Sequence, residues 1–114
     1  LSDTIGSATP KMINVVYEYF SMKYPNVEFG LHLHSHPQFW REKVETSIDS
    51  GCLRIDGAIQ GFGGCPMASD NMIGNMPTEK IITFCEEKGI ESGINPLKFE
   101  VAYNYASDIF LNYK

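Results

Sequence analysis

Apolar residues recur every three or four positions in four stretches of the chain, which is the spacing of an amphipathic helix. The first stretch begins at Thr9 and Pro10, an N-cap residue followed by the residue favoured at the first helical position. Pro25 and Asn26 mark its end. One apolar face is expected to pack into the core, and it comprises Met12, Val15, Val16, Tyr19 and Met22.

The second stretch, residues 38–50, predicts a helix that ends with Gly51 as its C-cap. The stripe expected to face the core consists of Trp40 or Arg41, Val44 and Ile48. The charged residues expected on the solvent-facing side are Glu42, Lys43 and Glu45.

Two more helices are predicted in the second half of the chain. Pro77-Thr78-Glu79 opens one of them, with an acidic residue in the first turn, and Gly89 ends it. Its inward residues are expected to be Ile81, Ile82 and Cys85. Asn95-Pro96 opens the last helix, whose apolar positions are Leu97, Val101, Ala102, Tyr105, Ala106, Ile109 and Phe110.

Three segments outside these helices read as strands, namely residues 1–5, 27–34 and 52–59. Strands that alternate with helices are typical of right-handed βαβ units with a parallel sheet, so the predicted fold class is α/β. In the third strand the period leaves open whether Asp56 faces solvent or lies inward near a site. Residues 69–76 form a polar segment after the third strand.

The composition narrows the classes of partner. A net charge of −5 argues against nucleic acid or an anionic membrane surface. No apolar run approaches the roughly 20 residues of a membrane-spanning helix, and nothing at the start resembles a signal peptide. Three irregularly spaced cysteines indicate a reducing compartment rather than a disulfide framework. The 114 residues suffice for one modest core, and the opening at Leu1 indicates a piece of a longer polypeptide.

A glycine-rich loop holds the most distinctive candidate for chemistry. Gly61-Phe62-Gly63-Gly64-Cys65-Pro66 presents one cysteine directly after the third predicted strand. Glycine allows close approach of the backbone to a ligand, and proline stiffens the loop beyond the cysteine. The thiol is therefore a candidate acid, base or nucleophile. The alternative is a tight turn with a buried structural cysteine.

Two histidines end the second predicted strand. His32 and His34 lie at i and i+2, so their side chains project from the same face and could share a metal ion. His36 continues the spacing, but Pro37 is expected to end the strand there. Asp3, the histidine pair and Cys65 all follow strand ends, and parallel α/β folds gather their chemistry at the carboxyl ends of strands.

With these residues identified, the chain resembles the 3-hydroxy-3-methylglutaryl-CoA lyases of the DRE-TIM metallolyase superfamily. Residues 3–10 look like the strand-six motif of that family, and His32-Leu33-His34 looks like its paired metal ligands. Residues 61–66 look like its signature loop with the catalytic cysteine. Gly74-Asn75 and Thr78-Glu79 look like the segment that follows, whose asparagine completes the metal site.

The resemblance implies a (β/α)8 TIM barrel, of which residues 1–114 would be a partial domain with about strands 6–8. It implies cleavage of 3-hydroxy-3-methylglutaryl-CoA to acetyl-CoA and acetoacetate with Mg or Mn. The implied metal ligands are His32, His34 and Asn75, together with an aspartate that this sequence lacks. Cys65 would transfer protons, and the residues expected near the ligands or substrate are Asp3, Gly63 and Gly64.

The chain alone is then expected to be inactive, and to associate with a second copy or with the rest of the barrel. The cytoplasm is the expected location, or the mitochondrial matrix in a eukaryote. Ser35-His36-Pro37 departs from the usual family motif, and Cys65 to Asn75 is about one residue longer than usual. These departures leave fine substrate specificity open.

Two other readings remain open. A related synthase, which joins acetyl-CoA to a 2-oxo acid, shares the histidine pair but not the Gly-Gly-Cys-Pro loop. A small non-enzymatic module could instead bind zinc structurally, through His32, His34, His36 and Cys65.

Overall fold

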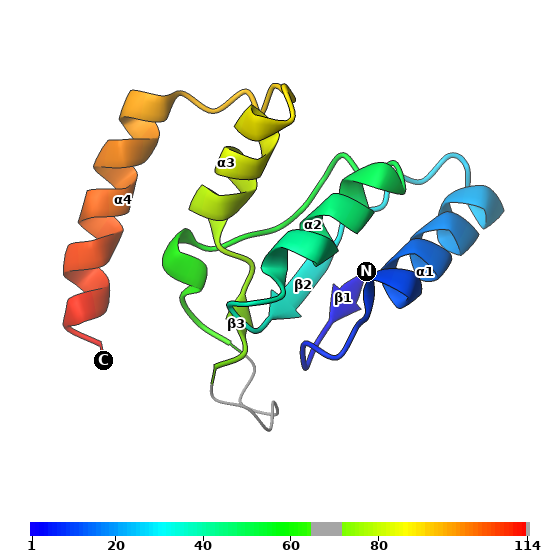
Figure 1. Cartoon of the computed structure of the whole chain (residues 1–114), viewed down its shortest axis with the longest axis horizontal. Helices are drawn as coiled ribbons and strands as arrows, with labels where there is room; N and C mark the ends of the chain where they lie inside the picture. Colours follow the sequence, from blue (N-terminus) through cyan, green and yellow to red (C-terminus); the bar gives the residue numbers. More distant parts are fainter. Residues whose placement is uncertain (65–71, 114) are drawn as a thin grey trace.

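The computed structural model describes residues 1–64 and 72–113. Along the described chain, strands and helices alternate up to α3, and a final helix follows (Figure 1). The strands are β1 (Ser2–Asp3), β2 (His32–Ser35) and β3 (Gly74–Asn75). The helices are α1 (Pro10–Lys23), α2 (Trp40–Asp49), α3 (Thr78–Glu87) and α4 (Pro96–Leu111), and a 3-10 turn, η1, spans Ile59–Gly61.

The predicted helix boundaries follow from local capping chemistry. The Thr9 hydroxyl accepts a hydrogen bond from the Met12 amide at 3.2 Å, and the Asn95 side chain accepts one from the Lys98 amide at 3.0 Å. These bonds satisfy amides in the first turns of α1 and α4, so both N-caps are confirmed. Gly51 follows α2 at a φ of 95° and Gly89 follows α3 at 68°, the left-handed conformation that ends a helix.

The sheet has the order β1-β2-β3. β1 and β2 are parallel, with Ser2 opposite His32, so the predicted β1–α1–β2 unit is confirmed. β3 runs antiparallel to β2, with Asn75 opposite His34. This corrects the expectation of an all-parallel sheet, and it places a short strand within the predicted polar segment of residues 69–76. Backbone groups make this pairing, so the polar side chains of the segment gave no sign of it.

The predicted strand of residues 52–59 forms only isolated bridges, Leu31 with Ile55 and Ala58 with Pro77. The Leu31 amide bonds the Arg54 carbonyl at 2.9 Å, and the Ala58 amide bonds the Met76 carbonyl at 2.9 Å. The segment therefore has one short contact with β2 and another with the start of α3. Because a ladder needs consecutive partners along one neighbour, the expected continuous strand is not formed.

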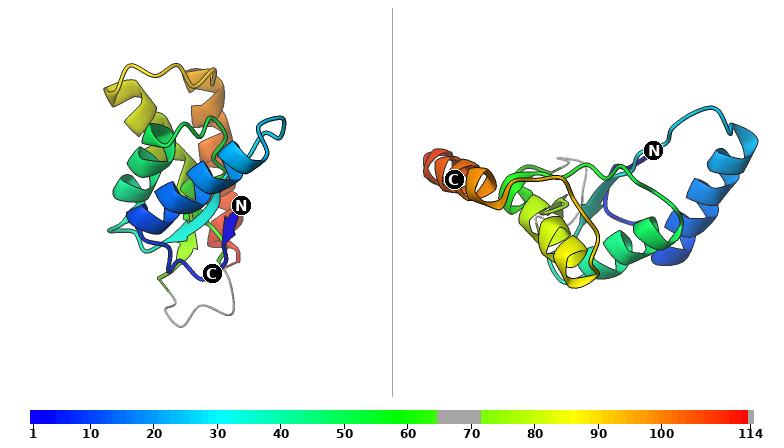
Figure 2. Two further views of the ribbon diagram at one scale, coloured as in Figure 1. Left: turned by 90° about the vertical axis from the view of Figure 1, so that its right-hand side faces the viewer. Right: turned by 90° about the horizontal axis from the view of Figure 1, so that it is seen from above.

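The core lies between the sheet and helices α1, α2 and α3. Its buried residues are Ile13, Tyr17, Leu31, Leu33, Val44, Cys52, Met76 and Phe84. The helices follow one another around the sheet, and α4 lies at one end of the molecule beyond α3 (Figures 1 and 2). Cys85 is buried as predicted, whereas the larger Phe84 beside it was not foreseen.

The apolar face predicted for α1 lies outside this core. Helix α1 is apolar on two sides, and Ile13 and Tyr17 are the pair that turns inward against α2. Met12, Val15, Val16, Tyr19 and Met22 are all exposed, from 42% to 82%. The sequence period alone could not choose between the two faces, because only the neighbouring elements decide which side is covered.

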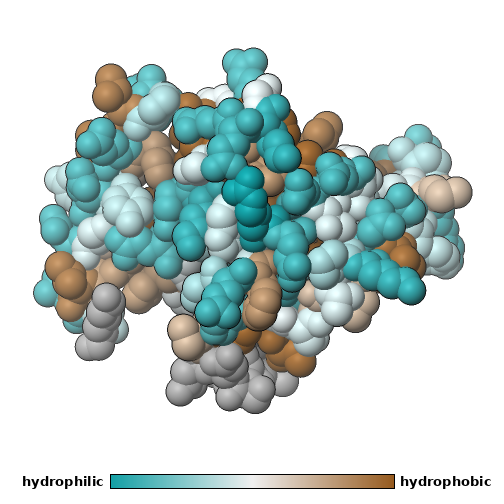
Figure 3. All heavy atoms as spheres, viewed as in Figure 1, coloured by the Kyte–Doolittle hydropathy of each residue, from teal (hydrophilic) through white to brown (hydrophobic). Residues whose placement is uncertain are grey.

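Helix α4 is likewise amphipathic without a buried face. None of its residues, all of them described, is buried, and Leu97, Val101, Tyr105 and Ile109 are at least half exposed. Apolar residues accordingly appear on the surface over α4 in Figure 3. No helix within the described parts of the chain is long and apolar enough to cross a membrane.

Candidate functional site

β2 brings the two predicted histidines together. Their side chains leave the same face of the strand, and the ring centroids are 5.1 Å apart in an edge-to-face arrangement. His34 is buried, with 8% of its surface exposed, whereas the side chain of His32 is 45% exposed. The pair therefore has one ring anchored in the protein and one at the surface.

The partners of the two rings determine which nitrogen is free. His34 Nδ1 lies 2.7 Å from the backbone oxygen of Asp3, and His32 Nδ1 lies 3.2 Å from Asp56 Oδ2. A carbonyl oxygen and a carboxylate can only accept, so each Nδ1 carries the hydrogen. In a neutral ring this leaves the lone pair on Nε2, which is the arrangement of a histidine prepared to bind a metal.

The sequence period does not decide whether the Asp56 side chain faces solvent or lies near a site, and the structure shows that it does both. Its side chain is 54% exposed and accepts the hydrogen bond from His32. The residue faces outward and at the same time orients a candidate ligand. Its segment is held beside β2 because the Asp56 amide bonds the Leu31 carbonyl at 2.9 Å.

Asn75 lies directly across from His34 in the sheet. Its Nδ2 donates to the Phe62 carbonyl at 2.9 Å, and its Oδ1 is a hydrogen-bond acceptor without a partner among the described residues. Its backbone amide donates to the Gly63 carbonyl at 3.1 Å. Asn75 is therefore fixed between β2 and the glycine loop, next to the histidine pair.

The loop glycines pack backbone against backbone. A Cβ at Gly61 would lie 2.7 Å from the Asn75 carbonyl oxygen, and one at Gly64 would lie 2.6 Å from the Ile73 oxygen. Gly63 adopts a φ of 85° against the Asn75 side chain. These contacts place Gly63 against the side chain of Asn75, and Gly64 against Ile73 and Gly74. Cys65, the predicted catalytic residue, lies outside the described residues.

His36 takes no part in the pair. Its Nδ1 accepts a hydrogen bond from the Gln38 amide at 3.2 Å, and its ring lies 5.7 Å from that of Phe39. The imidazole therefore closes the turn that leads into α2. Within residues 1–64 and 72–113, no three His, Cys, Asp or Glu side chains are grouped so that they could hold a metal ion.

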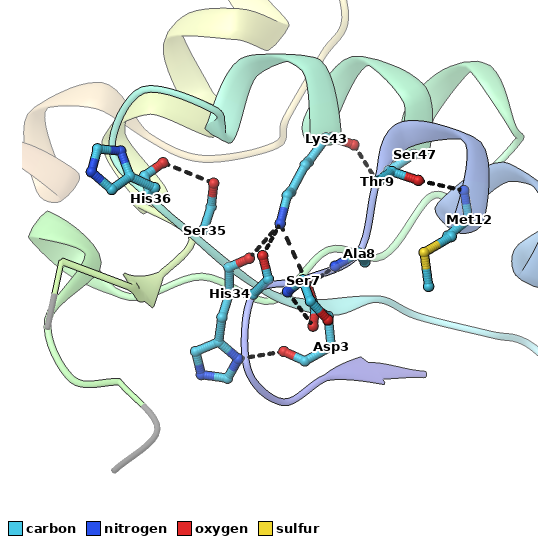
Figure 4. Close-up of polar contacts among 11 residues, drawn as sticks. Asp3, Ser7, Ala8, Thr9, Met12, His34, Ser35, His36, Lys43 and Ser47 are labelled. Atoms are coloured by element: carbon cyan, nitrogen blue, oxygen red, sulfur yellow. Dashed lines mark hydrogen bonds and ion pairs between the residues drawn. The ribbon is translucent and has the colours of Figure 1, made fainter. Parts of the chain in front are cut away.

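A buried charged pair lies directly behind His34. Lys43 on α2 is 4% exposed, which corrects its assignment to the solvent-facing side of that helix. Its Nζ lies 3.4 Å from Asp3 Oδ2 and donates to the carbonyls of Gly6 at 3.0 Å and His34 at 2.9 Å (Figure 4).

The stripe of Trp40, Lys43, Val44 and Ser47, at i, i+3, i+4 and i+7, is the sequence signal that could have revealed Lys43. Of these residues Lys43, Val44 and Ser47 are buried. A lysine within such a stripe can bury its stem and direct its charge to acceptors at the far end.

Asp3 is the second member of this pair. Its Oδ1 accepts from the Ser7 amide at 3.1 Å, and its Oδ2 accepts from the Ala8 amide at 2.9 Å. The carboxylate thus closes the turn between β1 and α1, while the Asp3 backbone oxygen holds the His34 ring. Asp3 therefore lies next to His34, and its role near a ligand stays a prediction.

The two described cysteines are buried. Cys52 and Cys85 are free thiols, 1% and 8% exposed. Burial raises the pKa of both thiols, because the thiolate loses hydration. A raised pKa lowers the fraction of reactive thiolate, so neither residue has the character of a nucleophile.

The donor set tests whether a divalent ion fits. Two imidazole nitrogens with fixed tautomers and one amide oxygen come from neighbouring strands, at the end of β2. Nitrogen and oxygen donors of this kind suit Mg²⁺, Mn²⁺ and Zn²⁺, and each of these ions would need further ligands. The described residues fit such an ion as a partial coordination shell.

Several of the known proteins that resemble this chain are hydroxymethylglutaryl-CoA lyases. No model of a known protein family matches the chain. The hydroxymethylglutaryl-CoA lyase YngG of Bacillus subtilis is 32% identical over 94 residues, which are 82% of this chain and 31% of the relative. The chain therefore spans about a third of the length of the curated relatives that it matches.

Solved structures give the same result. The crystal structure of the Bacillus subtilis HMG-CoA lyase superposes with a TM-score of 0.82 at 30% identity, over 95% of this chain and 36% of that one. An HMG-CoA lyase from Acinetobacter baumannii, in complex with coenzyme A and 3-methylmalate, superposes with a TM-score of 0.73 at 32% identity, over 83% of this chain and 31% of that one.

Proposed function

Because this chain belongs to the hydroxymethylglutaryl-CoA lyase family and corresponds to a C-terminal part of its members, we propose that it supplies the histidine side of a metal-dependent acyl-CoA lyase. The reaction proposed is cleavage of 3-hydroxy-3-methylglutaryl-CoA to acetyl-CoA and acetoacetate. The observation that carries the proposal is the histidine pair, whose Nδ1 atoms are both held by acceptors. Ligating histidines typically have such partners.

In this proposal, His32 and His34 present Nε2 and Asn75 presents Oδ1 to an Mg or Mn ion. A carboxylate from outside these residues would complete the set. When bound, the ion supplies Lewis-acid stabilisation of charge on the substrate oxygens. The Asp3 carbonyl and the Asp56 carboxylate keep the two imidazoles oriented, and Phe62 does the same for Asn75.

Cys65 is proposed to donate the proton that the acetyl-CoA enolate takes up during the reaction. In the sequence it directly follows Gly63 and Gly64, which lie against Asn75 and Ile73 respectively. Cleavage removes the proton of the tertiary hydroxyl and adds one to the acetyl-CoA enolate. We propose that the Cys65 thiol delivers that second proton.

The exposed apolar faces fit a partial barrel. Residues 1–114 would form about three of the eight strands, and the uncovered faces of α1 and α4 would meet the other strands and helices or a second copy. We therefore expect the chain on its own to self-associate. Sedimentation velocity would test this, and a monomer that persists at high concentration would contradict it.

An acetoacetate-release assay tests the function. It uses 3-hydroxy-3-methylglutaryl-CoA with Mg or Mn, on the complete polypeptide that carries this sequence and on the 114-residue chain. We expect turnover by the former and none by the latter if ligands are missing from the chain. Turnover by the 114-residue chain alone would contradict the proposed metal site.

Variants make the assignment specific. Cys65→Ala in the active polypeptide is expected to lower kcat by about 10²-fold or more, the scale for a proton-transfer group. The matched control is Cys85→Ala, which removes a buried thiol on α3 and should leave turnover nearly unchanged. Near-normal turnover by Cys65→Ala would overturn its role.

Two further measurements distinguish the competing readings. Condensation of acetyl-CoA with a 2-oxo acid, without lyase activity, would favour a synthase. Unfolding on treatment with a chelator, with neither activity present, would favour a structural zinc module.

A further inference from the structure

Lys43 is the one described lysine whose ammonium group is buried against a carboxylate and two backbone carbonyls. A lysine ammonium has three hydrogens, and here each has an acceptor, on Asp3, Gly6 and His34 (Figure 4). These acceptors lie on β1, on the turn after it, and on β2. One side chain from α2 therefore ties together the segments that surround the histidine pair.

The connections form a closed loop around His34. Lys43 Nζ holds the His34 carbonyl at 2.9 Å and the Asp3 carboxylate at 3.4 Å. The backbone oxygen of the same Asp3 holds His34 Nδ1 at 2.7 Å. The backbone and the ring of His34 are thus both fixed relative to Asp3, and a displacement of Asp3 would move the imidazole.

Stability alone is a poor account of this arrangement. A buried ion pair contributes little net stability, because loss of hydration offsets the attraction between the charges. Position 43 lies on the buried stripe of α2 beside Val44, which is fully buried. Unlike an apolar side chain, an ammonium group donates hydrogen bonds to three acceptors and so fixes their positions relative to one another.

We propose that Lys43 is a positioning residue, which fixes Asp3 and the His34 backbone and so directs His34 Nε2 toward a ligand position at the end of β2. The proposal rests on the function inferred for His34. It adds that α2, which carries none of the proposed ligands, takes part in arranging them.

The test uses the complete polypeptide that carries this sequence, with Lys43→Met, which keeps the length of the stem and removes the donors. Ser47→Ala is the matched control. Ser47 is also buried on α2, one turn further on, and its hydroxyl bonds only the Lys43 carbonyl among the described residues. Circular dichroism tests whether both variants remain folded.

Two measurements follow. Long-range proton–nitrogen correlation spectra of the imidazoles, recorded without metal, report which nitrogen of His34 carries the hydrogen. Electron paramagnetic resonance of free Mn²⁺ gives the dissociation constant of the ion. We expect Lys43→Met to mix the His34 tautomers and to raise the Mn²⁺ dissociation constant by about 10- to 100-fold. Ser47→Ala should change neither quantity.

An unchanged His34 spectrum in folded Lys43→Met protein would overturn the proposal. If the single variant does not fold, Asp3→Asn combined with Lys43→Met removes both charges, leaves none unpaired, and is expected to give the same tautomer mixing. Absence of Mn²⁺ binding by the unaltered protein would count against the proposed function only, because the metal-free spectra still decide the role of Lys43.

Discussion

Helices α2 and α4 differ in a way that their sequences do not suggest. α2 is rich in charged residues, yet Lys43, Val44 and Ser47 are buried on its inner side. α4 is longer and more apolar, yet none of its residues is buried. α2 lies against α1 and α3, whereas α4 meets the rest of the described chain mainly at η1 and the loop after it.

The difference shows that burial depends on the neighbours of a helix more than on its own apolar content. α2 has a helix on each side and the sheet beneath it. Among the described residues, Ser107 of α4 accepts a hydrogen bond from Gln60 Nε2 at 2.6 Å, and Phe110 stacks on Phe62 with 3.8 Å between the ring centroids. An apolar face without a neighbour remains at the surface.

The same substitution on the two helices gives the sharpest contrast. Val44 is fully buried and Val101 is 60% exposed. In the 114-residue chain, Val44→Ala is expected to lower the free energy of unfolding by about 2 kcal/mol, from lost burial and the cavity left behind. Val101→Ala should change it by less than about 0.5 kcal/mol. Urea denaturation measures both.

Equal losses in the two variants would mean that α4 is covered in solution, and the comparison would fail. The same two substitutions can then be made in the complete polypeptide. A larger loss for Val101→Ala there would show that another segment covers α4.

The attachment of α4 can be tested at its aromatic contact. Phe110→Ala removes the ring stacked on Phe62 and is expected to weaken the docking of α4 by about 1 kcal/mol, the scale of an aromatic pair. Because α4 has few other contacts, hydrogen exchange should accelerate along α4 and remain unchanged in α2. Phe99→Ala is a useful control, since that ring contacts only Tyr103 of its own helix among the aromatic pairs of the described chain. Faster exchange throughout the protein would contradict a local attachment.

The smallest effect concerns the buried thiol that follows α2. Burial raises the pKa of Cys52, so the folded state disfavours its thiolate. The contribution of Cys52 to stability is complete below the pKa of an unfolded thiol, about 8.5, and is lost as pH rises through the folded-state pKa. Urea midpoints should therefore fall above that pH, with a smaller fall in Cys52→Ala protein. Identical slopes would show that Cys52 does not ionise in that range.

The sequence predicted those features that follow from local rules. Two N-caps, at Thr9 and Asn95, and the shared face of His32 and His34 need only neighbouring residues, and the structure has them. The proposed roles of Asn75 and Cys65 came from family resemblance, and they stay predictions.

Features that depend on distant segments were missed. Lys43 was read as solvent-facing, because a charged residue on a helix usually is, and its acceptors lie on β1 and β2. Residues 74–75 pair with β2 through backbone groups that have no sequence signature. The helical period predicted α1 correctly, but the face predicted to be buried was the wrong one. Ile13 and Tyr17 are buried because their side of α1 contacts α2.

The glycine contacts have a consequence for how this region can vary. Cβ atoms at Gly61, Gly64 and Gly74 would come within 2.6–2.8 Å of backbone oxygens, which cannot rotate away as side chains can. A library that randomises each position singly should therefore return almost only glycine at these three places. Gly51 meets nothing within 4 Å, and a library at that site should recover asparagine as well as glycine, since its φ of 95° is its one constraint. Any change in the loop's path must then arise from paired substitutions on both segments, so laboratory evolution by single steps would leave this region almost invariant.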